Sequence, residues 1–513
     1  MSFNFSKSQF VSTCTRCNKY AWLEKNKSDK KADVNEFTES LFDNGHKVGE
    51  LAKQYFNIDA DVTVLNKNDI PDTYAMVRET KKHLAAGTRV IAEASFDYNG
   101  FFCSVDILIR NNDGSYNIYE VKSSKRNLER EQLYDGVKEA YVIDAAYQQY
   151  VLEQCSLKIN KVIVVLLSET YVRGKLFEID KYFVQCDVTR FTTEMHDMVV
   201  DKLAEIGTVL SNSNEPPTEF TRGCNGCDYF KYCSESIPSP SPFDLYGLDF
   251  TRKCVLYNRG ISFFVAQNIV KLRPAALKQI EYYNRPNDAY VDKDKIREFL
   301  NTLRFPLYSL DFETYQAIVP EFEGMKISEA VPFQYSLHII KTPDGDYSIG
   351  SPDLDESHFL DVTGGDPRRA IAESLVRDIP RGSCVVACHK STEKGIIEKL
   401  AATFSDLADH LLSFEYVDPQ PLFQNGYYYV KAMGGSFSLK SILPALYPND
   451  PEMDYHNLQG SVKNGTQAMT AIMKVSEVSE EERNQIEEDL IKYCALDTFA
   501  VVKIIKKLYD VSK

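Results

Sequence analysis

The chain has 513 residues, of which 43% are hydrophobic, 26% charged and 12% aromatic, with a formal net charge of −15. This composition excludes a disordered, collagen-like or low-complexity chain, and no run approaches the ~18 apolar residues of a membrane span. The acidic balance lowers the expectation of a nucleic-acid partner without excluding one, since bound cations and local basic strips reverse the field inside a cleft.

The first residues, MSFNFSKSQF, contain no apolar core of the kind that a secretory signal needs, so we expect a cytoplasmic protein without a membrane partner. Residues 211–217 read as a loop, and the Pro/Ser-rich stretch 234–243 continues neither a helix nor a central strand. These breaks predict a first domain over 1–245, a helical connector over 246–300 and a second domain over 301–513.

Residues 101–122 predict a β-hairpin. NNDGS at 111–115 is strong turn chemistry between two strand-like runs. If Arg110 pairs with Tyr116, the register places Asp106 opposite Glu120, about 4.5–5.5 Å away. One face of the first strand is predicted to carry Cys103, Val105, Ile107 and Ile109.

Two carboxylates at that distance repel each other unless a cation lies between them, and oxygen ligands suit Mg²⁺ or Mn²⁺. Lys122 shares the face of Glu120, where it could touch a phosphate and polarise the attacking water. The alternative is a solvated strand face with Lys122 paired to Glu120. The following helix carries Asp144 and Gln148 one turn apart. Lys125 belongs to a basic strip that either holds a substrate backbone or is solvated surface.

Cys224, Cys227 and Cys233 form the motif C-x2-C-x5-C, a spacing that is typical of metal ligands. A fourth thiolate from elsewhere in the chain would complete such a site. Four thiolates bind either Zn²⁺ or a [4Fe–4S] cluster, and spacing alone does not separate the two.

The pattern V-D-I-L-x11-E-V-K, which ends at Lys122, resembles the PD-(D/E)xK core of RecB-like nucleases. Residues 5–240 resemble the CRISPR-associated RecB-like nucleases that bind an iron–sulfur cluster. The resemblance implies a restriction-endonuclease-like fold with Asp106, Glu120 and Lys122 catalytic and with Gln148 and Lys125 on the substrate. It also implies a [4Fe–4S] cluster, with zinc as the alternative, on Cys17, Cys224, Cys227 and Cys233.

One proposed cluster ligand has a competitor, and one position departs from that family. Cys14 competes with Cys17 as the first cluster ligand, although the residues after Cys17 fit better. The family usually has a histidine four residues after an early glycine, and here Gly49 stands at that offset. Glu50 and Glu93 are therefore the candidates for the remaining metal ligand.

In the second half, Asp311 and Glu313 lie two apart in PLYSLDFETY and share one strand face. Ser479 and Glu482 predict the capped start of a long C-terminal helix. Asp497 falls within the apolar stripe of that helix, where a carboxylate is costly unless it is paired or bound to metal. The alternative is a helix break that turns Asp497 outward.

Tyr493 lies one turn before Asp497, and Glu393 opens a helix after an apolar strand run; a solvated helix face is its alternative. This set resembles the DEDD exonucleases of the RNase H-like fold, in the subgroup with a tyrosine ahead of the last aspartate. The resemblance implies that Asp311, Glu313, Glu393 and Asp497 hold two divalent ions and that Tyr493 orients the attacking water.

The motifs DFETYQAIVPEFEG, FQYSLH, YYYVKAMGGSFSLKSILPALYP and YCALDT resemble a little-described bacterial family that joins both domains. There Lys440 would contact phosphate, unless its Gly-rich turn only opens a structural helix.

The resulting expectation is an α/β protein that acts as a metal-dependent DNA nuclease, exonucleolytic or directed at single strands. It would work in DNA repair or in defence against foreign DNA, with protein partners there and with RNA not excluded. The rival is a nucleic-acid-binding or assembly module with one or both sites inactive. Gly49 and Glu393 motivate it, because the families that these domains resemble usually have a histidine at the first position and an aspartate at the second.

Overall fold

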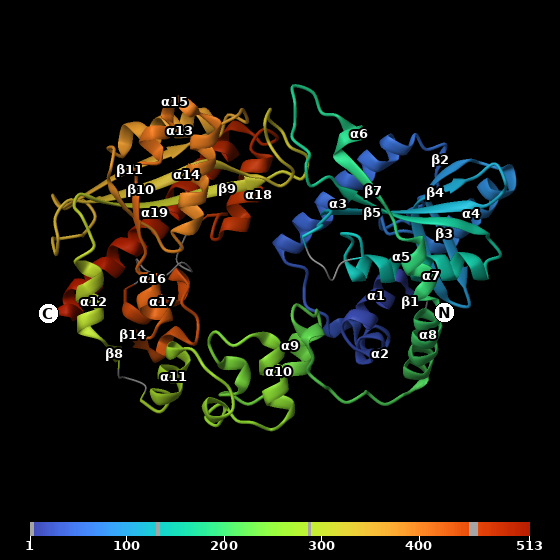
Figure 1. Ribbon diagram of the computed structural model, residues 1–513, viewed down its shortest axis with the longest axis horizontal. Coiled ribbons are helices and arrows are strands. Elements are labelled where there is room, and N and C mark those ends of the chain that lie inside the picture. Colours follow the sequence, from blue (N-terminus) through green and yellow to red (C-terminus); the bar gives the residue numbers. More distant parts are fainter. Residues whose placement is uncertain (1–4, 130–133, 286–288, 451–459) are drawn as a thin grey trace. The chain divides into compact units, whose positions relative to one another are not determined.

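The computed structural model describes residues 5–129, 134–285, 289–450 and 460–513. The chain forms two α/β units, Met1–Ile237 with Ile318–Ser328 and Pro238–Ala317 with Glu329–Lys513 (Figure 1). The division falls within the Pro/Ser-rich stretch, ahead of the boundary predicted near 245. The predicted connector 246–300 belongs to the second unit.

The first unit is built on a seven-stranded mixed sheet of order β2-β3-β4-β5-β6-β7, with β1 paired to β4. Its strands are β1 (Phe5–Ser6), β2 (Ala60–Asp61), β3 (Val90–Tyr98), β4 (Phe101–Arg110), β5 (Tyr116–Lys125), β6 (Ile159–Leu167) and β7 (Phe183–Asp187). Its helices are α1 (Lys7–Thr15), α2 (Asn18–Asn26), α3 (Glu36–Phe56), α4 (Thr73–Ala86), α5 (Glu139–Gln154), α6 (Ile179–Tyr182), α7 (Thr189–Glu194), α8 (His196–Ser211) and α9 (Phe230–Ser234). Side chains of α1, α5 and α8 pack against one face of the sheet, and those of α3 and α6 pack against the other.

The predicted hairpin is confirmed. β4 ends at Arg110, β5 begins at Tyr116, and the two residues pair in the expected register. The predicted common face of β4 is wrong, because Cys103 and Val105 join one core cluster while Ile107 and Ile109 pack against the other. The alternation breaks at Asp106, where the pairing with β3 also skips one position.

The segment Ile318–Ser328 packs onto the first unit, although it follows a strand of the second. Tyr182 donates a hydrogen bond from its hydroxyl to the carbonyl of Ile318 at 3.0 Å, and the Arg173 amide donates to the Met325 carbonyl at 2.9 Å. Ile318 and Ile327 are buried in the core beneath α3.

The second unit contains a five-stranded mixed sheet of order β11-β10-β9-β12-β13. Its strands are β9 (Leu307–Gln316), β10 (Ala330–Ile340), β11 (Leu354–Leu360), β12 (Cys384–Val386) and β13 (Glu415–Val417), and β8 (Ala289–Val291) pairs with β14 (Tyr428–Val430) apart from them. The helices are α10 (Phe250–Asn258), α11 (Pro274–Glu281), α12 (Lys293–Leu300), α13 (Arg368–Asp378), α14 (Ser391–Thr403), α15 (Ser405–Leu411), α16 (Gln420–Gln424), α17 (Leu439–Leu446), α18 (Gly465–Lys474) and α19 (Glu480–Ser512).

Helices α13, α14 and α15 form a hydrophobic core with the sheet, and α19 contacts β9 and β10. Ser479 and Glu482 form the predicted capping box at the start of α19. Residues between Leu245 and Ile280 enclose a small core of their own. In the described ranges, no helix is long and apolar enough to span a bilayer.

Candidate metal centres

The first group of candidate functional side chains lies where β4 and β5 run beside α1 and α5. We call it the first carboxylate site, and it comprises Lys7, Glu93, Asp106, Glu120, Lys122, Asp144 and Gln148. Lys122 donates to Glu120 and to Asp144, at 2.6 Å each. The amide of Gln148 donates to the same two carboxylates, at 2.7 and 2.9 Å. The site thus gathers residues that lie far apart along the chain.

Asp106 and Glu120 face the same site, although the pairing of β4 with β5 ends at Ile107 and Tyr119 and does not include them. Asp106 accepts a hydrogen bond from the Val121 amide at 2.7 Å, and Lys7 lies 3.6 Å from Asp106 and 3.0 Å from Glu120. Glu93, opposite the break in β4, has a left-handed φ of 57° and accepts a hydrogen bond from Ser104 at 3.1 Å. The residue with this left-handed conformation, Glu93, is one of the metal ligands that the sequence predicts.

Burial dominates the electrostatics of the first carboxylate site. Burial, followed by repulsion from Asp106 and Asp144, raises the pKa of Glu120 to about 7. Burial also raises the pKa of Asp106 and of Glu93. Although burial opposes it, attraction by Lys122 and Lys7 holds the pKa of Asp144 below its usual range. The site therefore contains more carboxylates than its two lysines neutralise.

A pocket of about 290 Å³ opens onto these acids. It is lined by Glu93, Asp106, Lys122 and one side of α3, including His46, Gly49 and Glu50. The carboxylate of Glu50 is 68% exposed and pairs with Lys53 at 2.7 Å. Glu50 thus borders the pocket, but its carboxylate is paired with the amine of Lys53.

Two predicted substrate residues lie elsewhere than expected. Gln148 is fully buried behind Glu120, so it orients that carboxylate and does not face a substrate. The Lys125 amine donates to the carbonyl of Ile327 at 3.4 Å. The sequence could not reveal this contact, because it joins residues 202 positions apart.

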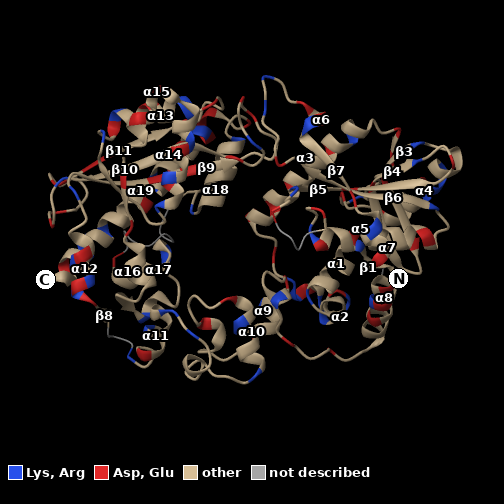
Figure 2. Ribbon diagram, viewed as in Figure 1, with Lys and Arg blue, Asp and Glu red and all other residues tan. Residues whose placement is uncertain are grey.

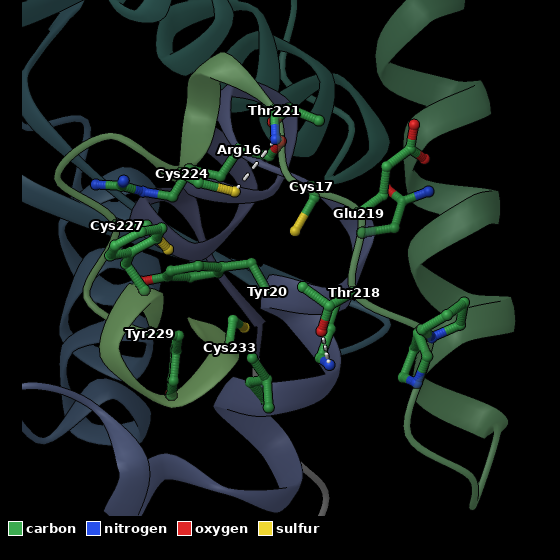
Figure 3. A pocket seen from close by; sticks show the side chains of 16 residues that line it. Arg16, Cys17, Tyr20, Thr218, Glu219, Thr221, Cys224, Cys227, Tyr229 and Cys233 are labelled. Atoms are coloured by element: carbon green, nitrogen blue, oxygen red, sulfur yellow. Dashed lines mark hydrogen bonds between the residues drawn. The ribbon is translucent and has the colours of Figure 1, made fainter. Parts of the chain in front are cut away.

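The cysteine pocket is a cavity of about 300 Å³ lined by Cys17, Cys224, Cys227 and Cys233. Their sulfur atoms surround one space in Figure 3, which the ring of Tyr20 borders. Cys17 precedes α2, Cys224 ends a 3₁₀ turn (Arg222–Cys224), and Cys233 lies in α9.

Burial raises the pKa of the Cys17, Cys227 and Cys233 thiols, which favours their protonated form unless a cation is bound. Cys14 lies in α1 against the sheet core and does not line this pocket. The geometry therefore groups Cys17, and not Cys14, with the three later cysteines.

The second carboxylate site lies between β9, α14 and α19, and comprises Asp311, Glu313, Glu393, Tyr493 and Asp497. All but Asp311 are buried, including Asp497, so α19 does not turn that residue outward. The Tyr493 hydroxyl hydrogen-bonds Asp497. Asp311 and Glu313, with the thiol of Cys494, place ligand atoms within 4.8 Å of one another and could hold a metal ion.

The acids of this site repel one another. Burial, followed by repulsion from Asp497, raises the pKa of Glu313 to about 8, and burial raises that of Glu393 to about 7. Burial and the charges of Asp497, Glu313 and Glu393 together raise the pKa of Asp311. One oxygen of Glu393 is buried without a hydrogen-bond partner. These are environments in which a cation is stabilising.

Lys440, at the start of α17, approaches the second carboxylate site. Its amine is 5.5 Å from the centre of the Tyr493 ring, and its charge lowers the pKa of Glu313 against the larger effect of burial. Thr498 fixes this part of α19, since its hydroxyl bonds His338 at 2.8 Å and Ser336 at 2.9 Å.

Sequence reasoning missed Lys7, Cys494 and the pocket-lining His46. Cys494 directly follows Tyr493 in the sequence, and this position next to a predicted site residue could have identified it as a candidate. Lys7 had no local signal, because its partner Glu120 lies 113 residues away.

Basic and acidic residues both occur along helices such as α12 and α13 (Figure 2). Pairs such as Arg369 with Glu373 neutralise each other locally. Basic side chains are therefore present on the surface although the net charge of the chain is −15.

Residues 308–438 match the model of DUF2779, a domain of unknown function. The matched span contains Asp311, Glu313 and Glu393 and ends before α19. No curated protein matches the chain. A solved structure entitled "Crystal structure of SSO0001" aligns at 11% identity over 45% of this chain and 86% of its own, with a TM-score of 0.22.

Proposed function

We propose that the protein is a metal-dependent nuclease that hydrolyses phosphodiester bonds in DNA, from ends or on single strands. In this proposal the first unit is a RecB-like PD-(D/E)xK domain with an iron–sulfur cluster, and the second is an RNase H-like DEDD exonuclease domain. The observation that carries it is the convergence of buried carboxylates, from elements remote in the sequence, at two places. A role in DNA repair or in defence against foreign DNA rests on the resemblance alone.

At the first carboxylate site, Asp106, Glu120 and Glu93 are the ligands that would hold Mg²⁺ or Mn²⁺. Such an ion supplies Lewis-acid activation of water and neutralises charge at phosphate. Gln148 and Lys122 keep the Glu120 carboxylate in one orientation through the hydrogen bonds that they donate. Lys122 also lines the pocket, where it can contact a substrate phosphate.

At the second carboxylate site, Asp311, Glu313, Glu393 and Asp497 offer four carboxylates, a donor set that suits two hard divalent cations. Tyr493, held by its bond to Asp497, presents a hydroxyl that can orient an attacking water.

In this proposal the cysteine pocket holds a [4Fe–4S] cluster, with zinc as the alternative. Cys17, Cys224, Cys227 and Cys233 line one cavity of about 300 Å³, and four thiolates are the donor set that either group takes. The choice of the cluster rests on the resemblance to the iron–sulfur nucleases.

The test is cleavage of single-stranded DNA, duplex DNA and RNA with Mn²⁺ or Mg²⁺, by the wild type and by Asp106→Asn, Asp497→Asn and the double variant. Loss of a metal ligand is expected to lower the rate of the affected site by roughly 10²–10⁴-fold. The double variant is expected to lose all cleavage. Asp201→Asn, on the surface of α8, is the matched control.

A second candidate, a nucleic-acid-binding or assembly module with an inactive site, is favoured by one contact. Lys7 bonds both oxygens of Glu120, where an amine competes with a metal ion. Equal cleavage by the wild type and the double variant would reject the nuclease sites, and nucleic-acid binding without cleavage would support this candidate.

A further inference from the structure

Lys7 is the first residue of α1, and its amine reaches into the first carboxylate site. Its Nζ lies 3.0 Å from each oxygen of Glu120 and 3.6 Å from Asp106. Its side chain is 22% exposed, whereas that of Glu120 is 1% exposed. Lys7 is thus a cation that contacts the two central acids and remains accessible to solvent.

The backbone that carries Lys7 is held in place. Ser6 and Gln9 form a capping box around the start of α1. One turn later, Phe10 is fully buried and stacks on Tyr147 with ring centres 4.6 Å apart. Tyr147 also donates from its hydroxyl to the carbonyl of Phe5 at 3.1 Å. Any displacement of the amine therefore comes from rotation of the lysine side chain.

The formal charge of the first carboxylate site equals the charge that one divalent cation would neutralise. The site contains four carboxylates and two amines, so its formal charge with all groups ionised is −2. The acids are Glu93, Asp106, Glu120 and Asp144, and the amines are those of Lys7 and Lys122. An ion bound to Glu120 would repel the ammonium of Lys7 from those oxygens without removing it from the site. The Asp106 carboxylate, 3.6 Å away, and the phosphate of a bound strand are then the anions available to that ammonium.

We propose that Lys7 is a phosphate-binding residue of the first carboxylate site, whose amine gives up Glu120 to a divalent cation and then contacts the substrate backbone. This inference rests on the proposed nuclease function, because it assigns a metal and a phosphodiester to the site. It assigns opposite effects to one side chain: Lys7 weakens metal binding and strengthens nucleic-acid binding.

The test compares Lys7→Gln and Lys7→Arg in the full-length chain carrying Asp311→Asn, Glu313→Gln and Asp497→Asn, which together remove the central metal-ligand candidates of the second carboxylate site. Mn²⁺ affinity is measured by titration calorimetry without nucleic acid. Affinity for a short single-stranded DNA is measured by fluorescence anisotropy with Ca²⁺ in place of Mn²⁺. Lys161→Gln, which removes an amine that is 52% exposed and pairs with Asp187, is the matched control.

Lys7→Gln is expected to bind Mn²⁺ about 3- to 10-fold more tightly and DNA about 5- to 10-fold more weakly, the scale of one charged contact. Lys7→Arg is expected to stay near the unsubstituted protein in both assays. Loss of both affinities would indicate a purely structural role and overturn the proposal, as would unchanged DNA affinity. Wild-type protein that binds both probes but cleaves nothing would refute the nuclease function and leave these two measurements decisive for Lys7.

Discussion

The carboxylates of the second site combine deep burial with close neighbours of the same charge. Glu313 is 7% exposed and Glu393 is 4% exposed. In water each would ionise near its ordinary pKa, but removal from solvent and repulsion from Asp497 make the ionised form of Glu313 costly. A folded chain without metal therefore retains protons that an unfolded chain releases. This difference makes stability a readout of the site.

Metal-free protein is expected to lose stability as pH rises between about 4.5 and 8. An unfolded glutamate releases its proton near 4.5, whereas folding raises the pKa of Glu313 to about 8, so the folded state binds more protons in this window. Glu313→Gln should flatten that slope and raise the free energy of unfolding at pH 8 by roughly 1–3 kcal/mol. Urea denaturation with a chelator at pH 5 and pH 8 measures it. An equally steep slope in the variant would contradict the prediction.

At the scale of elements, local patterns predicted the parts of the sites that lie on one hairpin or one helix. The turn at 111–115 and the alternation of β5 were sufficient to predict that Arg110 pairs with Tyr116. That register also predicts that Asp106 lies near Glu120. The apolar stripe of α19 was sufficient to predict that Asp497 is buried. The break at Glu93 was not visible, because a left-handed residue inside a strand has no sequence pattern when it is not glycine.

Helix α1 connects two sites that the sequence treats separately. Its first residue reaches the first carboxylate site, and Cys17 follows two residues beyond its end at Thr15. At that end, the Arg16 guanidinium donates to the carbonyl of Gly223 at 3.2 Å. A Cβ on Gly223 would lie 2.5 Å from the carbonyl oxygen of Thr15. The helix is therefore seated directly against the segment that carries Cys224.

Gly223→Ala is expected to move the end of α1 and to destabilise the protein by about 1–3 kcal/mol, the usual cost of overpacking. It should also lower the iron bound per chain, because the displaced backbone leads into Cys17. Thermal unfolding and iron analysis measure the two effects. Gly207→Ala, in α8, meets nothing within 4 Å and serves as the control, with neutral or slightly raised stability. Normal iron content in Gly223→Ala would show that the cysteine pocket does not depend on this contact.

At the scale of the molecule, each unit has a hydrophobic core of its own. The first unit is cored on both faces of its sheet, and the segment Ile318–Ser328 contributes Ile318 and Ile327 to one of those faces. The second unit has a core beneath α13 and α14 and a smaller one between Leu245 and Ile280. Composition could not reveal that a segment following β9 completes the first unit, because its apolar residues suit either core equally well. Separate cores allow the two units to unfold in separate transitions.

Loss of the proposed cluster should therefore affect one transition more than the other. Cys227→Ser removes a proposed cluster ligand, and binding energy at such a site is folding energy for the unit that contains it. We expect the variant to lose iron and visible absorbance and to lower the midpoint of one thermal transition by circular dichroism, while Asp497-dependent cleavage persists. Cys155→Ser, at a half-buried thiol of the same unit outside the cysteine pocket, is the control and should keep its iron. A single transition that shifts as a whole in Cys227→Ser, with cleavage lost at both sites, would mean that the cluster stabilises the entire chain, because the stability of the second unit would then depend on the first.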